Sequence, residues 1–447
     1  MSEQQPPAIS AIADDPKAVF LATMARELHQ AGVATDTLEE TLSDVASAIG
    51  LTTQIFALPT QITIAVGPAW NQKIVLMRLP PGRVNLRKLS QLNTVYDELR
   101  AGKIDYREAS VAVSEVDRRS PGRNALWEIP ALTLLAVGVA ILLGGGAREL
   151  IVAGCIGFFT GIVSAVAERV PIVARLFEAI AAFAATLIVA AFSKIFGPTN
   201  IFISIVAGVV VLLPGYSLTL ALHELANGDL VAGMARLGRV LSVLLELGCG
   251  AFLGFAVIGP SLLRTGDVTP HAVPSHLWIL AAVLMAVGIS IDLDSRARDF
   301  VWVFAACFVA LLTSHLLAGT HVQAISAFLS AFLCGIVANV GARVLRVPQA
   351  LMLVPALLVL VPGSLSYESV LFAFQHNISS AFTFASNATF AAVQLVAGLL
   401  LSQLVFPAKA LQLRRGAGRE RLNIVQPNRI LAARSRILGA CKSRRHS

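Results

Sequence analysis

The sequence predicts an α-helical polytopic membrane protein of ten spans, arranged as two inverted five-helix repeats, with a small cytoplasmic α+β domain at the N-terminus. Three observations support this prediction. First, 56% of the 447 residues are hydrophobic and the mean hydropathy is +0.73, whereas soluble domains are roughly half apolar. Second, apolar runs long enough to cross a membrane begin only after Trp127. Third, the apolar region contains an internal repeat.

The N-terminal part has the pattern of a soluble domain. Residues 1–16 are expected to be disordered and residues 17–125 to form the cytoplasmic domain. Apolar residues recur at helical spacing in four segments, 15–32, 36–50, 85–102 and 106–119. Residues 53–67 and 72–80 are rich in Ile and Val and predict strands. The region has one His, no Cys and no glycine-rich phosphate loop, so nothing in it indicates an enzyme, a cofactor or a metal site.

The remainder of the chain contains ten apolar runs. Each is close to the roughly 20 residues that cross a hydrocarbon core about 30 Å thick. They lie near residues 128–146, 150–167, 176–196, 200–223, 238–259, 276–292, 300–318, 321–341, 349–374 and 384–406. The first five form a predicted membrane repeat over residues 126–265, and the last five form a second repeat over residues 270–406.

The distribution of positive charge predicts the orientation, because Lys and Arg are retained on the cytoplasmic side. With the N-terminus inside, the cytoplasmic loops carry eight Arg residues and the opposite loops carry three Lys or Arg residues. The predicted tail, residues 407–447, holds eleven Lys or Arg residues and one acid. Such a tail beside a span favours anionic lipid headgroups over nucleic acid as its partner. We therefore expect a multi-pass protein of the plasma (inner) membrane with both termini in the cytoplasm.

The internal repeat consists of four matched segments in the same order. They pair LLAVGVAILLGGGAREL at 134 with LMAVGISIDLDSRARDF at 284, EAIAAF at 178 with QAISAF at 323, LLPG at 212 with LVPG at 360, and ELGCG at 246 with QLVAG at 394. Each unit contains five spans. Because five is odd, the second unit must enter the membrane from the opposite side, so the repeats are expected to be inverted.

Each repeat carries a helix breaker inside an apolar run, at Pro214-Gly215 and at Pro362-Gly363. A proline removes one backbone hydrogen bond from a helix. Free backbone groups are tolerated at membrane depth only against protein or a water-filled cavity, and secondary transporters place such broken helices around a substrate site near the midplane. We therefore expect the two breaks to lie close together and to line a transport pathway.

Hydroxyl groups follow both breaks and are candidates for binding the ammonium, carboxylate or hydroxyl group of a small substrate. Alternatively, short polar side chains in a span face a neighbouring helix or repair the freed backbone. The candidate residues are Tyr216, Ser217, Thr219, Ser364, Ser366 and Tyr367.

Acidic residues inside spans are costly to insert, so each is a functional hypothesis. Glu246 is the first candidate for proton coupling, because a carboxyl group at that depth can bind and release a proton, whereas its repeat mate Gln394 keeps the size without the charge. Alternatively, Glu246 makes a structural hydrogen bond. Glu178 and its mate Gln323 open their helices, where an acid also favours the helix dipole.

Three further residues remain candidates for proton coupling. His223 and Glu224 begin an HELAN segment that lacks the second His of a zinc motif, so they mark the end of a span or act in gating. Glu368 follows the second break by one turn and is a weaker candidate. Asp294, beside Arg296 at a predicted interface, is expected to be solvated.

The chain also resembles the threonine/serine exporter family over residues 17–406. The resemblance rests on LLPGYSLTLALHELANGDLVAGMARL, on GVATDTLEETLSDVASAIGL followed by LPTQITI, and on the two five-span halves. It implies export of small polar amino acids such as threonine and serine, driven by protons, with a cytoplasmic N-terminal domain. The second half departs from the pattern, since only the Pro-Gly pair and a few hydroxyls remain around residue 362.

Other functions remain open at this point. Some members of the family divide the halves between two chains and are linked to dicarboxylate export, so a succinate-like substrate is the main alternative. A membrane-embedded enzyme is less favoured, because the spans contain neither a Ser-His-Asp grouping nor a His/Cys cluster. A channel is less favoured, because it gives no reason for one unpaired acid in an inverted repeat.

Overall fold

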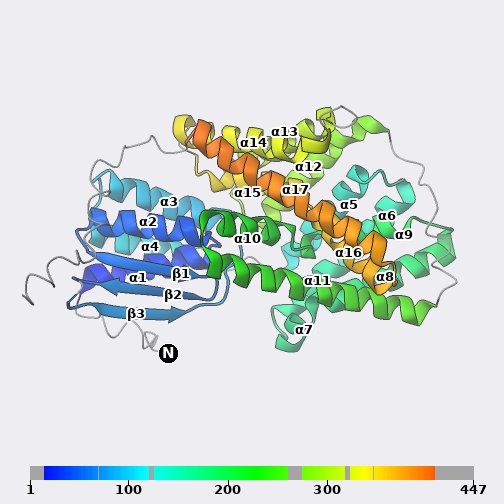
Figure 1. Cartoon of the computed structure of the whole chain (residues 1–447), viewed down its shortest axis with the longest axis horizontal. Coiled ribbons are helices and arrows are strands. Elements are labelled where there is room, and N and C mark those ends of the chain that lie inside the picture. Colours follow the sequence, from blue (N-terminus) through cyan, green and yellow to red (C-terminus); the bar gives the residue numbers. More distant parts are fainter. Residues whose placement is uncertain are drawn as a thin grey trace, which may run out of the picture. The chain divides into compact units, whose positions relative to one another are not determined.

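The computed structural model describes residues 15–68, 70–119, 125–259, 274–317, 323–345 and 347–407 (Figure 1). Within these ranges the protein is mostly helical, and its strands lie in the N-terminal region, residues 15–119. Nearly all of the predicted disordered segment 1–16 and of the basic tail 407–447 falls outside the described residues, and so does the expected lipid contact of the tail.

The N-terminal region contains the four helices that the apolar spacing predicts. They are α1 (Pro16–Gln30), α2 (Thr35–Ala48), α3 (Leu86–Arg100) and α4 (Tyr106–Arg119). The Asp15 side chain caps α1 by accepting hydrogen bonds from the backbone N–H groups of Lys17 and Ala18, and Asn85 caps α3 in the same way. Such caps satisfy donors that a first helical turn leaves free.

Three antiparallel strands complete this region in the order β1 (Thr53–Leu58), β2 (Gln61–Val66) and β3 (Lys73–Arg78). The sequence analysis treats 53–67 as one strand-forming run, but the run contains two strands. Pro59 cannot donate a ladder hydrogen bond, and the chain reverses there so that Leu58 pairs with Gln61. The helices cover one face of the sheet (Figure 1), where Ile62 and Ile64 are buried.

The two predicted membrane repeats consist of helices in the structure. The first repeat contains α5 (Glu128–Leu142), α6 (Ala147–Ala167), α7 (Pro171–Arg175), α8 (Phe177–Phe196), α9 (Ile201–Gly208), α10 (Gly215–Asn227) and α11 (Leu230–Ile258). The second repeat contains α12 (Trp278–Asp292), α13 (Phe300–Leu317), α14 (Ser326–Val340), α15 (Ala350–Leu360), α16 (Gly363–Phe374) and α17 (Ile378–Val405).

Among the described residues, seven helical segments are long and apolar enough to cross a membrane, or eight if the bent α9–α10 pair forms one span. Two further apolar helices, α5 and α12, have 15 residues each, fewer than the roughly 20 that span a bilayer. Large apolar side chains such as Leu245, Phe382 and Leu404 are exposed. The protein is therefore a polytopic integral membrane protein.

Two contacts between the halves are reciprocal. Gly138 in α5 packs against the Ala281 carbonyl oxygen of α12, and Gly288 in α12 packs against the Ala131 carbonyl oxygen of α5. In the repeat alignment Gly138 is the mate of Gly288, and Ala131 is the mate of Ala281. A Cβ atom at either glycine would lie less than 3.0 Å from a neighbouring side-chain atom, so the absence of side chains permits this close packing.

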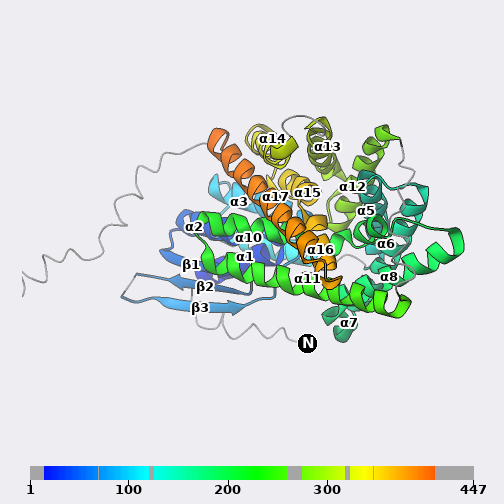
Figure 2. The ribbon, with the colours of Figure 1, turned by 45° about the vertical axis from the view of Figure 1, so that its right-hand side comes forward.

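The hairpins α10–α11 and α16–α17 have the same backbone turn. Gly228 follows α10 with φ 91°, and its repeat mate His376 follows α16 with φ 60°. A positive φ is uncommon for a residue other than glycine, so its occurrence at the two equivalent positions is informative. In both views α11 runs beside α10 (Figures 1 and 2).

Candidate functional site

The two helix breaks have nearly the same backbone angles at their prolines, but only the first bends its helix pair by more than 40°. α9 ends at Gly208, a 3-10 turn follows, and α10 starts after Pro214 at an angle of 59° to the preceding helix. In the second repeat α15 ends at Leu360 and α16 starts after Pro362. The backbone angles φ and ψ are −79° and 35° at Pro214 and −80° and 43° at Pro362.

The breaks lie against one another, as the internal repeat predicts. A Cβ atom on Gly215 would be 2.7 Å from Cγ2 of Val361 and 3.0 Å from Cα of Gly363. Conversely, a Cβ atom on Gly363 would be 3.0 Å from Cβ of Leu213. Since α10 and α16 both start here, the structure brings two helix N-termini, each with free backbone N–H groups and a partial positive charge, to one place.

Two of the predicted hydroxyl groups are buried without a partner. Thr219 is 1% exposed and Tyr367 is fully buried, and neither hydroxyl has a hydrogen-bond partner within the described part of the chain. These two residues are repeat mates, each four positions after the glycine of its break. A buried polar group without a partner costs about 1–3 kcal/mol, so a ligand that bonded to either hydroxyl would relieve that cost.

The other predicted hydroxyls divide into two kinds. Ser366 donates its hydroxyl hydrogen to the Pro362 carbonyl oxygen at 3.0 Å, which also accepts the Ser366 backbone N–H, so this hydroxyl bonds within its own helix. Tyr216, Ser217 and Ser364 are partly buried beside the breaks, close enough in sequence to Gly215 and Gly363 to line the same place.

Glu246 lies in a cluster that joins α8 to α11. Its carboxylate accepts a hydrogen bond from Ser242 at 3.0 Å and interacts with the Glu178 carboxyl group. Glu178 also forms an ion pair with Arg239 at 3.0 Å. In the second repeat, the Gln394 amide donates to the Ala324 carbonyl oxygen at 2.9 Å. The mates therefore hold equivalent helix pairs together, but only the first repeat uses two carboxyl groups.

Glu368 is a separate acidic candidate. It is 8% exposed in α16 and forms no ion pair with any residue that the structure describes. Because an isolated buried carboxylate is expensive, Glu368 remains a candidate for proton coupling.

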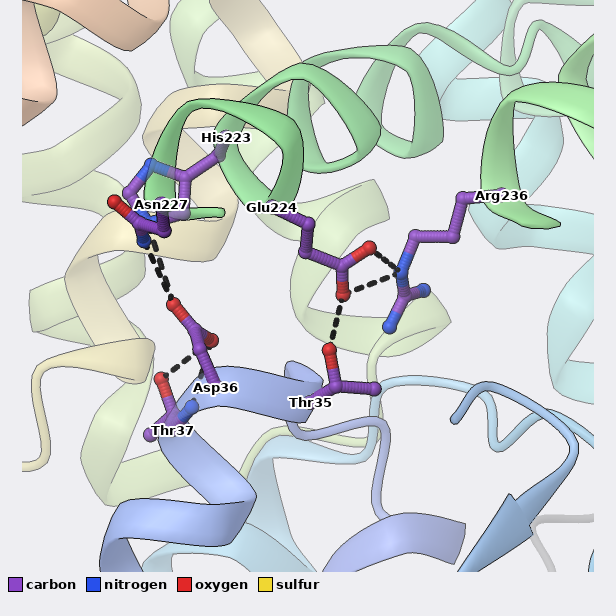
Figure 3. A network of polar contacts seen from close by, with 7 residues as sticks. All are labelled: Thr35, Asp36, Thr37, His223, Glu224, Asn227 and Arg236. Atoms are coloured by element: carbon purple, nitrogen blue, oxygen red, sulfur yellow. Dashed lines mark hydrogen bonds and ion pairs between the residues drawn. The ribbon is translucent and has the colours of Figure 1, made fainter. Parts of the chain in front are cut away.

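His223 and Glu224 lie away from the breaks and face the N-terminal region (Figure 3). Glu224 is fully buried, and both of its oxygens are 2.8 Å from Nε of Arg236. It also accepts a hydrogen bond from the Thr35 hydroxyl at 2.7 Å. A charge-assisted pair with this geometry is strong, so Glu224 has a structural partner that the sequence analysis does not identify.

Asp36 makes the neighbouring contacts in this network (Figure 3). Its Oδ2 accepts a hydrogen bond from the Asn227 amide at 3.1 Å and lies 3.5 Å from Nε2 of His223. Burial raises the pKa of Asp36, but the hydrogen bonds and charge of His223, the Thr37 N–H and Asn227 outweigh burial and leave that pKa below its usual value. The Asp36 carboxylate is thus stabilised in its charged form.

An apolar cavity of about 470 Å³ lies elsewhere, between α5 and α6. Its lining is almost entirely apolar and it is open to the outside, so it suits a lipid chain rather than a polar substrate. The lining residues are Thr133, Val137, Leu150, Ile151, Gly154, Cys155 and Phe158.

Comparison with known proteins agrees with this architecture. Residues 19–258 match the family model described as "Putative threonine/serine exporter", and residues 278–405 match a second model, "Threonine/Serine exporter, ThrE". The chain belongs to the threonine/serine exporter family. The two models of this family divide the chain where the internal repeat divides it, since the second begins at the first helix of the second repeat.

The curated relatives that the chain matches are longer proteins. The chain is 26% identical over 369 residues to pheromone-regulated membrane protein 10 of Zygosaccharomyces rouxii, which covers 79% of this chain and 37% of the relative. It is 25% identical over 391 residues to the protein of that name from Eremothecium gossypii, covering 85% of this chain and 52% of the relative. The chain thus matches about a third to a half of these relatives. No solved structure matches it.

Proposed function

We propose that this member of the threonine/serine exporter family is a secondary active transporter that exports small polar amino acids, threonine and serine first, by proton antiport. The observation that carries the proposal is the contact between the two Pro-Gly breaks, with the unpartnered hydroxyls of Thr219 and Tyr367 one turn beyond them. The proposed substrate site lies at these breaks.

The substrate carboxylate is recognised in this proposal by the facing N-termini of α10 and α16. Helix N-termini attract anions through free N–H groups and the helix dipole. In this proposal the carboxylate of an amino acid binds at these N-termini. Its side-chain hydroxyl and its ammonium group bond to the hydroxyls of Thr219 and Tyr367. A dicarboxylate would use the same N-termini for both of its ends, and it remains the second candidate for the substrate.

Proton coupling is assigned in this proposal to Glu246 together with Glu178. Two neighbouring carboxyl groups cannot both be charged without strong repulsion, so such a pair holds one proton over a range of pH. The nearby Arg239 pairs with the carboxylate that is charged. Gln394 cannot titrate, so the equivalent position of the second repeat lacks this group. Glu368 is the next candidate, whereas His223 and Glu224 are less suited because they contact the N-terminal region.

We further propose ten spans in two inverted repeats, with α5 and α12 as short spans. The reciprocal packing of Gly138 and Gly288, and that of Gly215 and Gly363, supports a two-fold relation, because each contact made by one half recurs with the halves exchanged. Inverted repeats of this kind are common in secondary transporters.

The proposed topology places both termini in the cytoplasm of a cell whose plasma membrane contains the protein. The N-terminal region contacts Glu128, Glu224 and Asp294, which lie at ends of spans that the charge distribution assigns to the cytoplasmic side. This agreement supports a cytoplasmic N-terminal domain. A membrane-embedded enzyme and a channel are not proposed.

The function is tested by comparing metabolites in cells with and without the protein and by counterflow in proteoliposomes. We expect threonine or serine to accumulate inside the deletion strain, and labelled threonine to exchange against unlabelled threonine. Accumulation of a dicarboxylate would transfer the proposal to the second substrate, and uncoupled flux without counterflow would overturn the transporter assignment.

A further inference from the structure

Among the contacts between the N-terminal region and the membrane helices, which include α3 with α15 and β1 with α11, two hydrogen-bonded places differ in character. The first place, here called the anchor, consists of Asn85, Leu86 and Arg87 against Leu293 and Asp294. Two backbone hydrogen bonds, from Leu86 N–H to the Leu293 oxygen at 2.9 Å and from Arg87 N–H to the Asp294 oxygen at 3.2 Å, join them.

Side chains reinforce the anchor. Arg87 forms an ion pair with Asp294 at 3.1 Å, and the Asn85 amide donates to the same carboxylate at 3.1 Å. Asp294, expected from the sequence to be solvated, is therefore held by the N-terminal region. Arg83 adds an ion pair to Glu128 at the start of α5, at 3.0 Å. The anchor thus holds the closely packed α5 and α12 pair.

The second place, here called the latch, consists of Thr35 and Asp36 against His223, Glu224 and Asn227 (Figure 3). Its hydrogen bonds are between side chains: Thr35 donates to Glu224 at 2.7 Å, and Asn227 donates to Asp36 at 3.1 Å. Side-chain contacts can separate without breaking the backbone hydrogen bonds of a helix or strand. The latch is therefore the attachment that opens more readily.

The latch is mechanically connected to the proposed substrate site. α10 starts at Gly215 in the break and ends at Asn227 in the latch, a rigid length of about 20 Å at 1.5 Å per residue. α11 returns from the same hairpin and supplies Arg236, which holds Glu224. Any tilt of α10 about the break moves the latch end relative to the α5–α12 pair.

We infer that the N-terminal region stays anchored to the end of α12 throughout transport and holds α10 through the latch in one state of the cycle only. This inference rests on the proposed transport function. Alternating access rocks one bundle of helices against the other. A region attached to α5 and α12 and also to α10 prevents that movement, so the latch must open for the substrate site to change sides.

The chain offers a matched pair of positions to test this. In each place an Asn amide donates to an Asp carboxylate at 3.1 Å: Asn227 to Asp36 in the latch and Asn85 to Asp294 in the anchor. In a background without the five native cysteines, one variant carries Asp36→Cys and Asn227→Cys, and the other carries Asn85→Cys and Asp294→Cys. A short bifunctional methanethiosulfonate reagent links each pair, and dithiothreitol releases it.

Threonine export from proteoliposomes is measured before linking, after linking and after release. We expect linking of the latch pair to stop export and release to restore it, whereas the linked anchor pair exports as fast as its unlinked form. A monofunctional methanethiosulfonate reagent should leave both variants active. Each variant is compared with its own unlinked form, so a loss caused by the substitutions does not enter the comparison.

Several outcomes overturn the inference. A linked latch pair that exports at the unlinked rate shows that the latch need not open, and a latch pair that never links shows that the contact is not formed in the membrane. Equal loss in both pairs shows that the whole region moves. If the unlinked variants and the parent protein insert but do not export threonine, the proposed function fails and the latch fails with it.

Discussion

The hairpins α10–α11 and α16–α17 have the same backbone course and different chemistry. In the first, the buried Glu224 forms an ion pair with the partly exposed Arg236. At the equivalent positions of the second, the rings of Phe372 and Phe384 stack with centroids 5.2 Å apart and planes within 12°. An ion pair can be broken by a competing partner or a proton, whereas a ring stack is held by apolar packing.

The same difference recurs deeper in the two repeats, where Glu246 of the first corresponds to Gln394 of the second. Glu246 accepts a hydrogen bond from Ser242 within its own helix. Gln394 donates one to the Ala324 carbonyl oxygen, just before the neighbouring helix α14. The comparison teaches that the two repeats share backbone geometry, while the ionisable groups at these positions of the first are replaced by uncharged ones in the second. Four predictions test how far this division extends.

The largest effect is expected from filling the contact between the breaks. Gly215→Leu would place side-chain atoms where Val361 and Gly363 already lie, and overpacking of this kind costs about 1–3 kcal/mol. We expect threonine export to fall below detection while the protein still inserts. Gly238→Leu is the control, because a Cβ atom there meets no neighbour within 4 Å. Normal export by Gly215→Leu would remove the breaks from the pathway.

A second large effect is expected from substitutions at the equivalent positions Glu246 and Gln394. Glu246→Gln keeps shape and hydrogen bonding but cannot bind and release a proton, so proton-driven export should be lost while threonine counterflow remains. Gln394→Glu should instead alter the pH dependence of export, because it adds a titratable group to the second repeat. The measurement is uptake and counterflow with and without a pH gradient. If Glu246→Gln exports threonine at the undiminished rate under a pH gradient, Glu246 is not the coupling residue and Glu368 becomes the next candidate.

A smaller effect, on stability, is expected at the hairpins. Arg236→Met leaves the buried Glu224 carboxylate without its partner, which typically costs about 3–5 kcal/mol. Phe384→Leu removes one ring of a stacked pair that is worth about 0.5–1.5 kcal/mol. Thermal unfolding of the purified variants in detergent compares them. Equal losses in the two variants would contradict the view that the first hairpin alone depends on charge.

The smallest effects are expected at the unpartnered hydroxyls. Thr219→Val and Tyr367→Phe each remove one hydrogen bond to substrate, worth about 1 kcal/mol, so each should raise the KM for threonine several-fold without lowering thermal stability. Ser366→Ala is the matched control, because its hydroxyl already bonds to the Pro362 oxygen and its loss should leave the KM unchanged. An unchanged KM in both test variants would show that these hydroxyls face no substrate.

Much of the fold follows from local patterns in the sequence. Apolar spacing and capping residues such as Asp15 and Asn85 predict the helices of the N-terminal region, and the spacing of matched segments predicts that the two breaks meet. The hairpin inside residues 53–67 could have been found from Pro59, since proline cannot continue a central strand. These features depend on residues close together in the chain or on the repeat.

The partners of Glu224 could not be predicted in this way. Thr35 lies 189 positions before Glu224, and Asp36 lies 191 positions before its own partner Asn227. No periodic pattern links a helix of a soluble region to the end of a span. Asp294 was expected to be solvated for the same reason, because its neighbours in sequence do not reveal Arg87. Contacts between regions depend on how folded surfaces fit, which local pattern does not encode.

The central claim, that substrate binds where the two breaks meet, is tested most directly by substrate protection. In a background without native cysteines, Ser364→Cys is labelled with a maleimide in proteoliposomes with and without threonine. The control restores Cys155, which lines the apolar cavity between α5 and α6. We expect threonine to slow labelling at Ser364→Cys and to leave Cys155 unaffected. Labelling of Ser364→Cys at the same rate with and without threonine, in protein that exports threonine, would contradict the claim.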